Sequence, residues 1–257
     1  SPVIILLPPS EGKEPGGTGT WRPGDGSFGE SLEGARKSVM AALPKTGDSA
    51  LKVRGAHAEH ARKSNAALGR SGSLHVRERY CGVVYQGLDY PTLSAAQKRV
   101  ANRSIVVVSG LAGLVAFNDT LPDYRAPIDA SVTGLGKLAS FWKPELEDVL
   151  RKLAKRHVIV DVLPQAHRSA MTPVGDWRRV ARRRSLVAAT IAPATRRALK
   201  VRVFWRQSPT TVRALVEDSE TIQAFDGFGN DFWFHVNTTH TPSCQPGEPK
   251  WWINPFA

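Results

Sequence analysis

The chain has 257 residues, 41% of them hydrophobic, which is enough for one or two ordinary domains with a real core. Its net charge of +12 and pI of about 10.1 favour a polyanionic partner, nucleic acid first and an anionic membrane second. No apolar run approaches the roughly 20 residues that span a membrane, and two cysteines make no disulfide framework. We therefore expect a cytoplasmic protein with no membrane partner.

The N-terminal segment predicts a buried strand followed by a loop that carries a cation. Residues Val3 to Leu7 are all apolar, and Pro8-Pro9-Ser10-Glu11-Gly12-Lys13 follows them. A lysine on a glycine-containing loop after a strand can hold a phosphate or carboxylate, although the spacing is not that of a P-loop. From the residues alone, a solvated loop lysine is the simpler interpretation of Lys13. Residues 14–29, rich in Gly and Pro, predict a long surface loop.

Residues 31–75 are predicted to be helical and basic, with Gly55 between two helix-like segments. A tight glycine turn between helices can present amide N–H groups to a DNA phosphate, with cations beside it. The alternative is an ordinary helix pair with a solvated basic face. His57 and His60 lie three residues apart, but two histidines without a third ligand are weak evidence for a metal site.

The next segments alternate in the manner of an α/β core. Arg79 to Leu88 predicts a strand entering a turn, and Pro91 to Ala101 predicts a helix. The helix would deliver the chain to a central strand, and this alternation indicates an α/β fold.

The stretch from Ser104 to Arg125 holds the candidate site. Ile105 to Val108 is a β-branched run that predicts a strand buried on both faces. Ligands of open α/β sheets lie just outside the carboxyl ends of strands, and four polar side chains follow this strand: Ser109, Asp119, Tyr124 and Arg125.

We expect Asp119 to be an acid or base, with Arg125 orienting it or holding a substrate anion. Lys13, from the neighbouring strand end, would supply a second cation, and Tyr124 would stack on or hydrogen-bond to a planar substrate. The alternative is a core strand, a loop and an Asp–Arg pair that pins the loop.

An amphipathic helix and another buried strand follow. Pro144 is predicted to open the helix, with acidic residues in its first turn and basic residues late. Val158 to Leu163 is predicted to be a strand that ends at Pro164-Gln-Ala-His167. A satisfied surface histidine is the simpler interpretation of His167.

A block of basic residues between Trp177 and Val216 contains no acidic residue. Such a block is costly unless an anion neutralises it or it spreads over exposed faces. We expect it to contact DNA phosphates, through Arg178, Arg179, Arg182, Arg183 and Arg184. Residues 226–257 are rich in aromatic side chains and form either a packing extension or a binding lid.

Three motifs, in order, resemble those of the YaaA peroxide-stress protein family. Leu7-Pro8-Pro9-Ser10-Glu11-Gly12-Lys13 is similar to the N-terminal motif of its actinobacterial branch. Arg79-Tyr80-x-Gly82-Val83-Val84-Tyr85-x-Gly87-Leu88 is similar to its RYTGxVYxxL motif, and Ser109-x-Leu111-x-Gly113-Leu114, Asp119 and Tyr124-Arg125 are similar to its signature. The matches cover residues 3–160. Two family patterns are missing: an acid and a tyrosine after Leu163, and a K-x-x-K-G motif where Gln207 to Leu215 stands. The resemblance indicates a divergent member.

The resemblance implies DNA binding through a helix-hairpin-helix, although the usual form carries two glycines and this stretch has one. It assigns that role to Lys52, Arg54, Gly55, Arg62 and Lys63. It also makes Lys13 a motif position and implies protection of DNA under peroxide stress.

We therefore expect one compact α/β domain over residues 1–225, with a mixed sheet, flanking helices and a basic helical insertion at about 31–75. Residues 226–257 would be an aromatic extension. The predicted function is DNA binding in peroxide stress, with double-stranded DNA as partner. The alternative is an enzyme acting on a small anionic or nucleobase-like substrate beside Ser109, which fits the remodelled motifs. No motif indicates a metal or a nucleotide cofactor.

Overall fold

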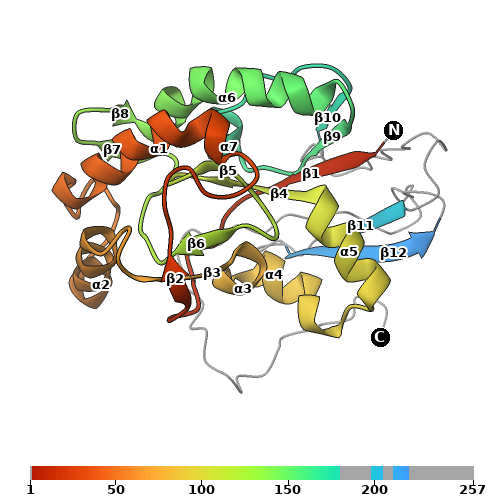
Figure 1. The fold of residues 1–257 in the computed structure, drawn as a ribbon, viewed down its shortest axis with the longest axis horizontal. Coiled ribbons are helices and arrows are strands. Elements are labelled where there is room, and N and C mark those ends of the chain that lie inside the picture. Colours follow the sequence, from red (N-terminus) through yellow and green to blue (C-terminus); the bar gives the residue numbers. More distant parts are fainter. Residues whose placement is uncertain (1, 180–197, 205–210, 220–257) are drawn as a thin grey trace.

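The computed structural model describes residues 2–179, 198–204 and 211–219 and has a five-stranded mixed sheet as its centre (Figure 1). The strand order is β10-β9-β1-β4-β5, and all pairs are parallel except β4 with β5. The strands are β1 (Val3–Leu7), β4 (Ile105–Ser109), β5 (Gly113–Ala116), β9 (Val158–Asp161) and β10 (Trp177–Arg179). The expected α/β fold with a mixed sheet is confirmed.

The three central strands form because their sequences are apolar and β-branched, and every residue of β1, β4 and β9 is buried. Leu7 pairs with Val107, and Leu6 pairs with Asp161. The loops that follow these three strands therefore leave from the same edge of the sheet. This edge is where a ligand of an open α/β sheet binds.

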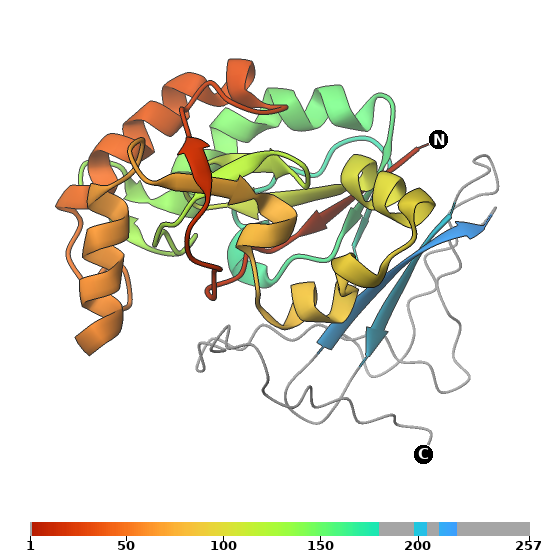
Figure 2. The same cartoon turned by 60° about the horizontal axis from the view of Figure 1, so that its bottom comes forward.

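Helices cover both faces of the sheet. Helices α1 (Gly29–Ala42) and α6 (Leu138–Ala154) lie on one face, whereas α4 (Val83–Leu88) and α5 (Ala95–Ser104) lie on the other, as Figures 1 and 2 show. The hairpin of β11 (Ala198–Phe204) and β12 (Thr211–Ser219) packs beside α4 and α5 (Figure 2). None of the helices in the described ranges is long and apolar enough to cross a membrane.

Smaller elements surround this core. A second sheet has the order β2-β3-β6, and a short hairpin pairs β7 with β8. Their bounds are β2 (Thr18–Thr20), β3 (Gly72–His75), β6 (Thr120–Pro122), β7 (Ser131–Val132) and β8 (Gly136–Lys137). The remaining helical segments are η1 (Leu43–Lys45), α2 (Gly55–Ala66), α3 (Val76–Arg79), η2 (Tyr90–Thr92) and α7 (Gln165–Arg168).

Four predicted element assignments were wrong. Arg79 to Leu88 is not a strand, since α3 ends at Arg79 and α4 begins at Val83, with a single bridge between Tyr80 and Lys13 in between. Its β-branched residues are overridden by tertiary contacts, because the guanidinium of Arg79 is fully buried and donates to four backbone carbonyls.

Helix α6 begins at Leu138, six residues before the proline that was expected to open it, and has no acidic residue in its first turn. The last part of the predicted helical region, residues 72–75, is strand β3, because it pairs with both β2 and β6. In the Gly- and Pro-rich segment 14–29, strand β2 and the buried Trp21 replace a purely surface loop.

A buried arginine holds the turn that follows β4. Arg36 on α1 is fully buried and donates to the carbonyl oxygens of Ala112 and Leu114, on either side of Gly113. Gly113 has a φ of 69°, and a side chain there would lie 2.8 Å from the ring of Trp142. The β4–β5 turn is therefore rigid, and Ser109 at its start has a fixed position.

Candidate functional site

A chain of three hydroxyl groups runs through the core at the carboxyl end of β4. The hydroxyl of Tyr124 lies 2.8 Å from Ser109 Oγ and 2.6 Å from the hydroxyl of Tyr80, and all three residues are buried. Burial raises the pKa of Tyr124 to about 12, so its hydroxyl stays protonated at neutral pH. These hydrogen bonds between hydroxyl groups fix the rings of Tyr80 and Tyr124 in place.

Lys13 lies over these rings. Its Nζ is 4.5 Å from the ring centroid of Tyr124 and 5.9 Å from that of Tyr80, and it donates one long hydrogen bond of 3.3 Å to the carbonyl of Glu11. Burial lowers the pKa of Lys13 to about 8. Of the nearby charges, Asp123 raises this pKa and Arg125 lowers it, so the two effects oppose each other. The amine therefore has a lowered pKa and lies over the faces of two aromatic rings.

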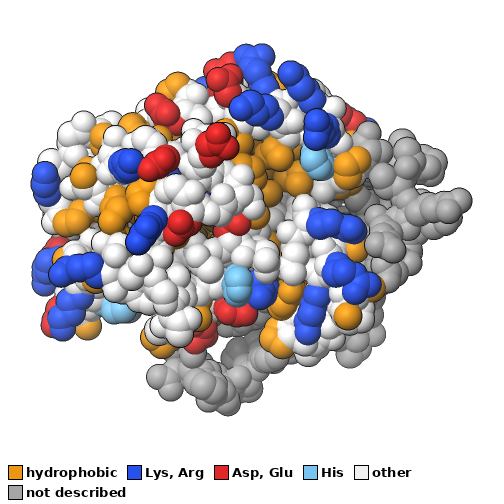
Figure 3. All heavy atoms as spheres, viewed as in Figure 1, with side chains coloured by type: hydrophobic (Ala, Val, Ile, Leu, Met, Phe, Trp, Pro, Cys, Tyr) orange, Lys and Arg blue, Asp and Glu red, His pale blue; other side chains and the backbone are white. Residues whose placement is uncertain are grey.

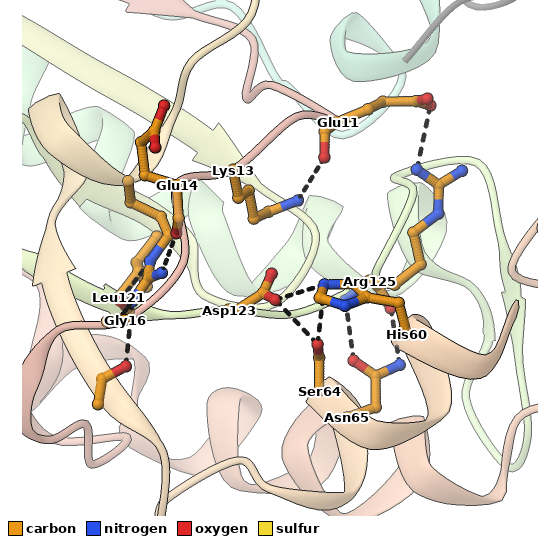
Figure 4. A network of polar contacts seen from close by, with 12 residues as sticks. Glu11, Lys13, Glu14, Gly16, His60, Ser64, Asn65, Leu121, Asp123 and Arg125 are labelled. Atoms are coloured by element: carbon orange, nitrogen blue, oxygen red, sulfur yellow. Dashed lines mark hydrogen bonds and ion pairs between the residues drawn. The ribbon is translucent and has the colours of Figure 1, made fainter. Parts of the chain in front are cut away.

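Asp123 is the carboxylate of this cluster, and the sequence analysis did not identify it. Its Oδ2 lies 2.6 Å from His60 Nε2 and accepts a 2.9 Å hydrogen bond from Ser64 Oγ. Both partners come from α2, so they fix the carboxylate below Lys13 (Figure 4). A sequence signal existed, because Asp123 and Arg125 flank the buried Tyr124 in an extended segment and must point away from it.

Arg125 connects the cluster to the loop before α2. Its guanidinium pairs with Glu11 at 3.3 Å and donates to the carbonyl of Leu51 at 3.1 Å. Its backbone forms two 2.9 Å hydrogen bonds with the side chain of Asn65. Lys13, Tyr124, Arg125 and Ser109 are thus brought together, as expected.

Asp119 lies elsewhere. Its carboxylate accepts hydrogen bonds from the backbone and hydroxyl of Ser27 and from the backbone of Ala116. Within the described ranges it makes no contact with Arg125, and the expected Asp–Arg pair is wrong. The physical reason is strand β6, which starts directly after Asp119 and carries the chain away before Arg125.

The predicted DNA-binding residues at the start of α2 form a coherent group. Gly55 is the first residue of α2 and has a φ of 56°, a left-handed conformation that favours glycine. No heavy atom lies within 4 Å of where its Cβ would be. Arg54 occupies the N-cap position of α2, but its side chain makes no capping hydrogen bond. Lys52 pairs with Asp129, Arg62 with Asp48 and Lys63 with Glu59.

Of the second predicted basic group, the structure describes Arg178 and Arg179, which lie far from α2. Arg178 pairs with Asp176, and Arg179 lies 3.9 Å from Asp161. Both are on β10, which is far from α2 along the long axis in Figures 1 and 2. Lys and Arg side chains on the face in Figure 3 gather in separate groups, around α2, over α6 and over α5. Arg182, Arg183, Arg184 and residues 226–257 lie outside the described residues.

His167 differs from the expected satisfied surface histidine. Both of its ring nitrogens are buried and have no hydrogen-bond partner among the described residues. Burial lowers the pKa of His167 to about 4, against the raising effect of Asp129. The ring is therefore neutral at pH 7.

Comparison with known proteins identifies the family to which the chain is similar. A sequence model described as "Peroxide stress protein YaaA" matches residues 3–207, which is more of the chain than the residues 3–160 that the motif resemblance covers. A UPF0246 protein of Streptomyces coelicolor is 35% identical over 201 residues, covering 74% of this chain and 75% of its own. A UPF0246 protein of Corynebacterium glutamicum is 40% identical over 131 residues, 48% of this chain and 50% of its own, and one of Polaromonas sp. is 35% identical over 95 residues, 35% and 37% respectively.

Proposed function

Because the chain belongs to the family described as peroxide stress protein YaaA, we propose that it binds the backbone of double-stranded DNA and protects DNA under peroxide stress. We assign the contact to the start of α2. The observation that carries the proposal is the conformation of Gly55. Its φ is positive and the space where a Cβ would lie is empty, so a phosphate can approach the first turn of the helix.

The first turn of a helix offers backbone N–H groups and the positive end of the helix dipole. No side chain caps α2 at Arg54, so a phosphate oxygen can accept from these groups. Lys52 and Arg54 directly precede the turn and supply cations. The geometry suits a helix-hairpin-helix type of grip, with η1 and the following turn leading into α2.

The cations of this group are held by weak surface pairs. The side chains of Lys52, Arg62 and Lys63 are all more than half exposed, and such pairs contribute at most about 1 kcal/mol. Phosphates can therefore replace the carboxylates. Arg178 and Arg179 are a separate group, because β10 lies far from α2 along the long axis of the molecule.

The test is affinity for a short duplex measured over a range of salt concentrations. If three or four phosphates are contacted, the logarithm of the association constant should fall linearly with the logarithm of the salt concentration, with a slope of about −3 to −4. Gly55→Val should weaken binding, because the side chain fills the path of the phosphate. Gly134→Val is the matched control, since Gly134 also has a positive φ, of 79°, and open space before it. Equal affinity of the two folded variants, or a salt-independent affinity, would contradict the proposal.

A second function is favoured by the cluster around Lys13. An amine with one long hydrogen bond, two aromatic ring faces beneath it and Arg125 nearby suits a small anionic or nucleobase-like ligand. In this proposal the chain is an enzyme whose Arg125 holds the substrate anion next to Lys13, with Asp123 in the acid–base role first expected of Asp119. A thermal-shift screen of small anions and nucleobases tests it, and any stabilisation should vanish in Lys13→Gln.

A further inference from the structure

Lys13 has few partners for a partly buried lysine. Its single hydrogen bond is to the carbonyl of Glu11, and among the described residues no carboxylate lies within 4.0 Å of its Nζ. The nearest other groups are the faces of Tyr124 and Tyr80. Lysines that are desolvated and placed beside other cations act as nucleophiles toward carbonyl groups.

We propose that Lys13 is a nucleophile that forms an imine with a small carbonyl compound carrying an anionic group. The proposal rests on the second function above and names its substrate class and its first covalent step. Three features support it: a partly buried amine with one hydrogen bond, a carboxylate that His60 and Ser64 hold near it, and an arginine for the anion.

The surroundings favour the free amine. Burial is the main cause that lowers the pKa of Lys13 to about 8; Arg125 and Arg79 lower it further, whereas Asp123 and Glu11 raise it. At pH 7 roughly a tenth of the amine is then unprotonated, against fewer than about one in a thousand for an ordinary lysine.

The step balances within these groups. The lone pair of Lys13 Nζ attacks the carbonyl carbon, and the carbonyl oxygen takes up a proton to give a carbinolamine. That oxygen then leaves as water when the C=N bond forms, so one amine and one carbonyl give one imine and one water. Asp123 is positioned to take and return the proton, since His60 and Ser64 hold its carboxylate in place.

Arg125 would recognise the anionic group of the substrate. It is only 17% exposed, and its partner Glu11 is 39% exposed on the loop after β1. A substrate carboxylate can replace Glu11 and form a bidentate pair with the guanidinium. This places the anionic group of the substrate on the Arg125 side and its carbonyl at Lys13.

The experiment uses glyoxylate as the probe, with sodium cyanoborohydride to reduce the imine by hydride transfer, followed by peptide mapping of the full chain. Lys98 is the internal control, because it also donates to a backbone carbonyl, of Pro91 at 3.0 Å, and lies 5.6 Å from a tyrosine ring centroid. We expect Lys13 to be labelled at least ~10-fold faster than Lys98 at pH 7.5, because burial lowers the pKa of the Lys13 amine. The rate at Lys13 should level off above about pH 8.

Variants separate this proposal from simple anion binding. Lys13→Arg keeps the cation and should lose the adduct, and Arg125→Gln should slow labelling by glyoxylate but not by neutral acetaldehyde. Equal labelling of Lys13 and Lys98 in the native chain would overturn the proposal without any variant. If anions still stabilise the protein while Lys13 stays unlabelled, the imine is refuted and the ligand site stands. If anions do not stabilise the protein and Lys13 stays unlabelled, both the imine and the ligand site are refuted.

Discussion

Asp119→Asn tests whether this carboxylate is structural. The side chain bridges the turn between β5 and β6 to residue 27, where it accepts from the backbone N–H and from the hydroxyl of Ser27 at 2.8 Å, and it also accepts from the backbone of Ala116 at 2.8 Å. Asparagine keeps the shape but has one acceptor oxygen, so its NH₂ group must face a donor. We therefore expect a loss of stability and no direct effect on ligand binding.

The magnitude follows from these contacts. Each hydrogen bond to a charged group is worth about 1.5–3 kcal/mol, and the substitution disrupts at least one of three. Because Ser27 is exposed, the lower end applies, and we expect about 2 kcal/mol. For a chain of this size, that lowers Tm by about 4–8 °C.

Urea unfolding followed by circular dichroism measures the effect. Asp148→Asn is the matched control, since Asp148 is exposed on α6 and should change the stability by less than about 0.5 kcal/mol. Gly26→Ala approaches the same carboxylate from the other side, because its Cβ would lie 2.7 Å from Asp119 Cγ, and should destabilise too. An Asp119→Asn protein of unchanged stability that no longer responds to ligands would refute the structural role.

Three further predictions follow from buried polar groups. Arg36→Met should lower the free energy of unfolding by about 3 kcal/mol or more in urea, because four carbonyl oxygens lose their donor. His167 has a folded-state pKa of about 4, below the unfolded value of 6.5, so the unfolded chain binds more protons between these pH values. Stability should therefore fall as the pH drops from 6.5 to 4, by up to about 3 kcal/mol, and His167→Phe should lose this part of the pH dependence. Tyr124→Phe should lower Tm by several degrees, because it leaves the hydroxyls of Tyr80 and Ser109 without their shared partner.

The sequence by itself determined the elements whose signal is local. The apolar runs that form β1, β4 and β9 were placed correctly, because a strand buried on both faces is encoded by consecutive side chains. The sequence also singled out Gly55 as a turn residue, and glycine is the residue that adopts its φ of 56° without strain. The order of these strands' loops also placed Ser109, Tyr124 and Lys13 at one edge of the sheet.

Only the tertiary structure decided which carboxylate joins that edge. Asp119 and Asp123 are four residues apart and chemically identical, and their roles differ through partners that are distant in sequence. Ser27 lies 92 positions from Asp119, and His60 lies 63 positions from Asp123. No periodicity in the sequence encodes such contacts, because they arise when α2 and the loop before α1 pack against the strands. The same reason makes Arg79 the end of a helix: its side chain is fixed by backbone carbonyls of other segments rather than by its neighbours.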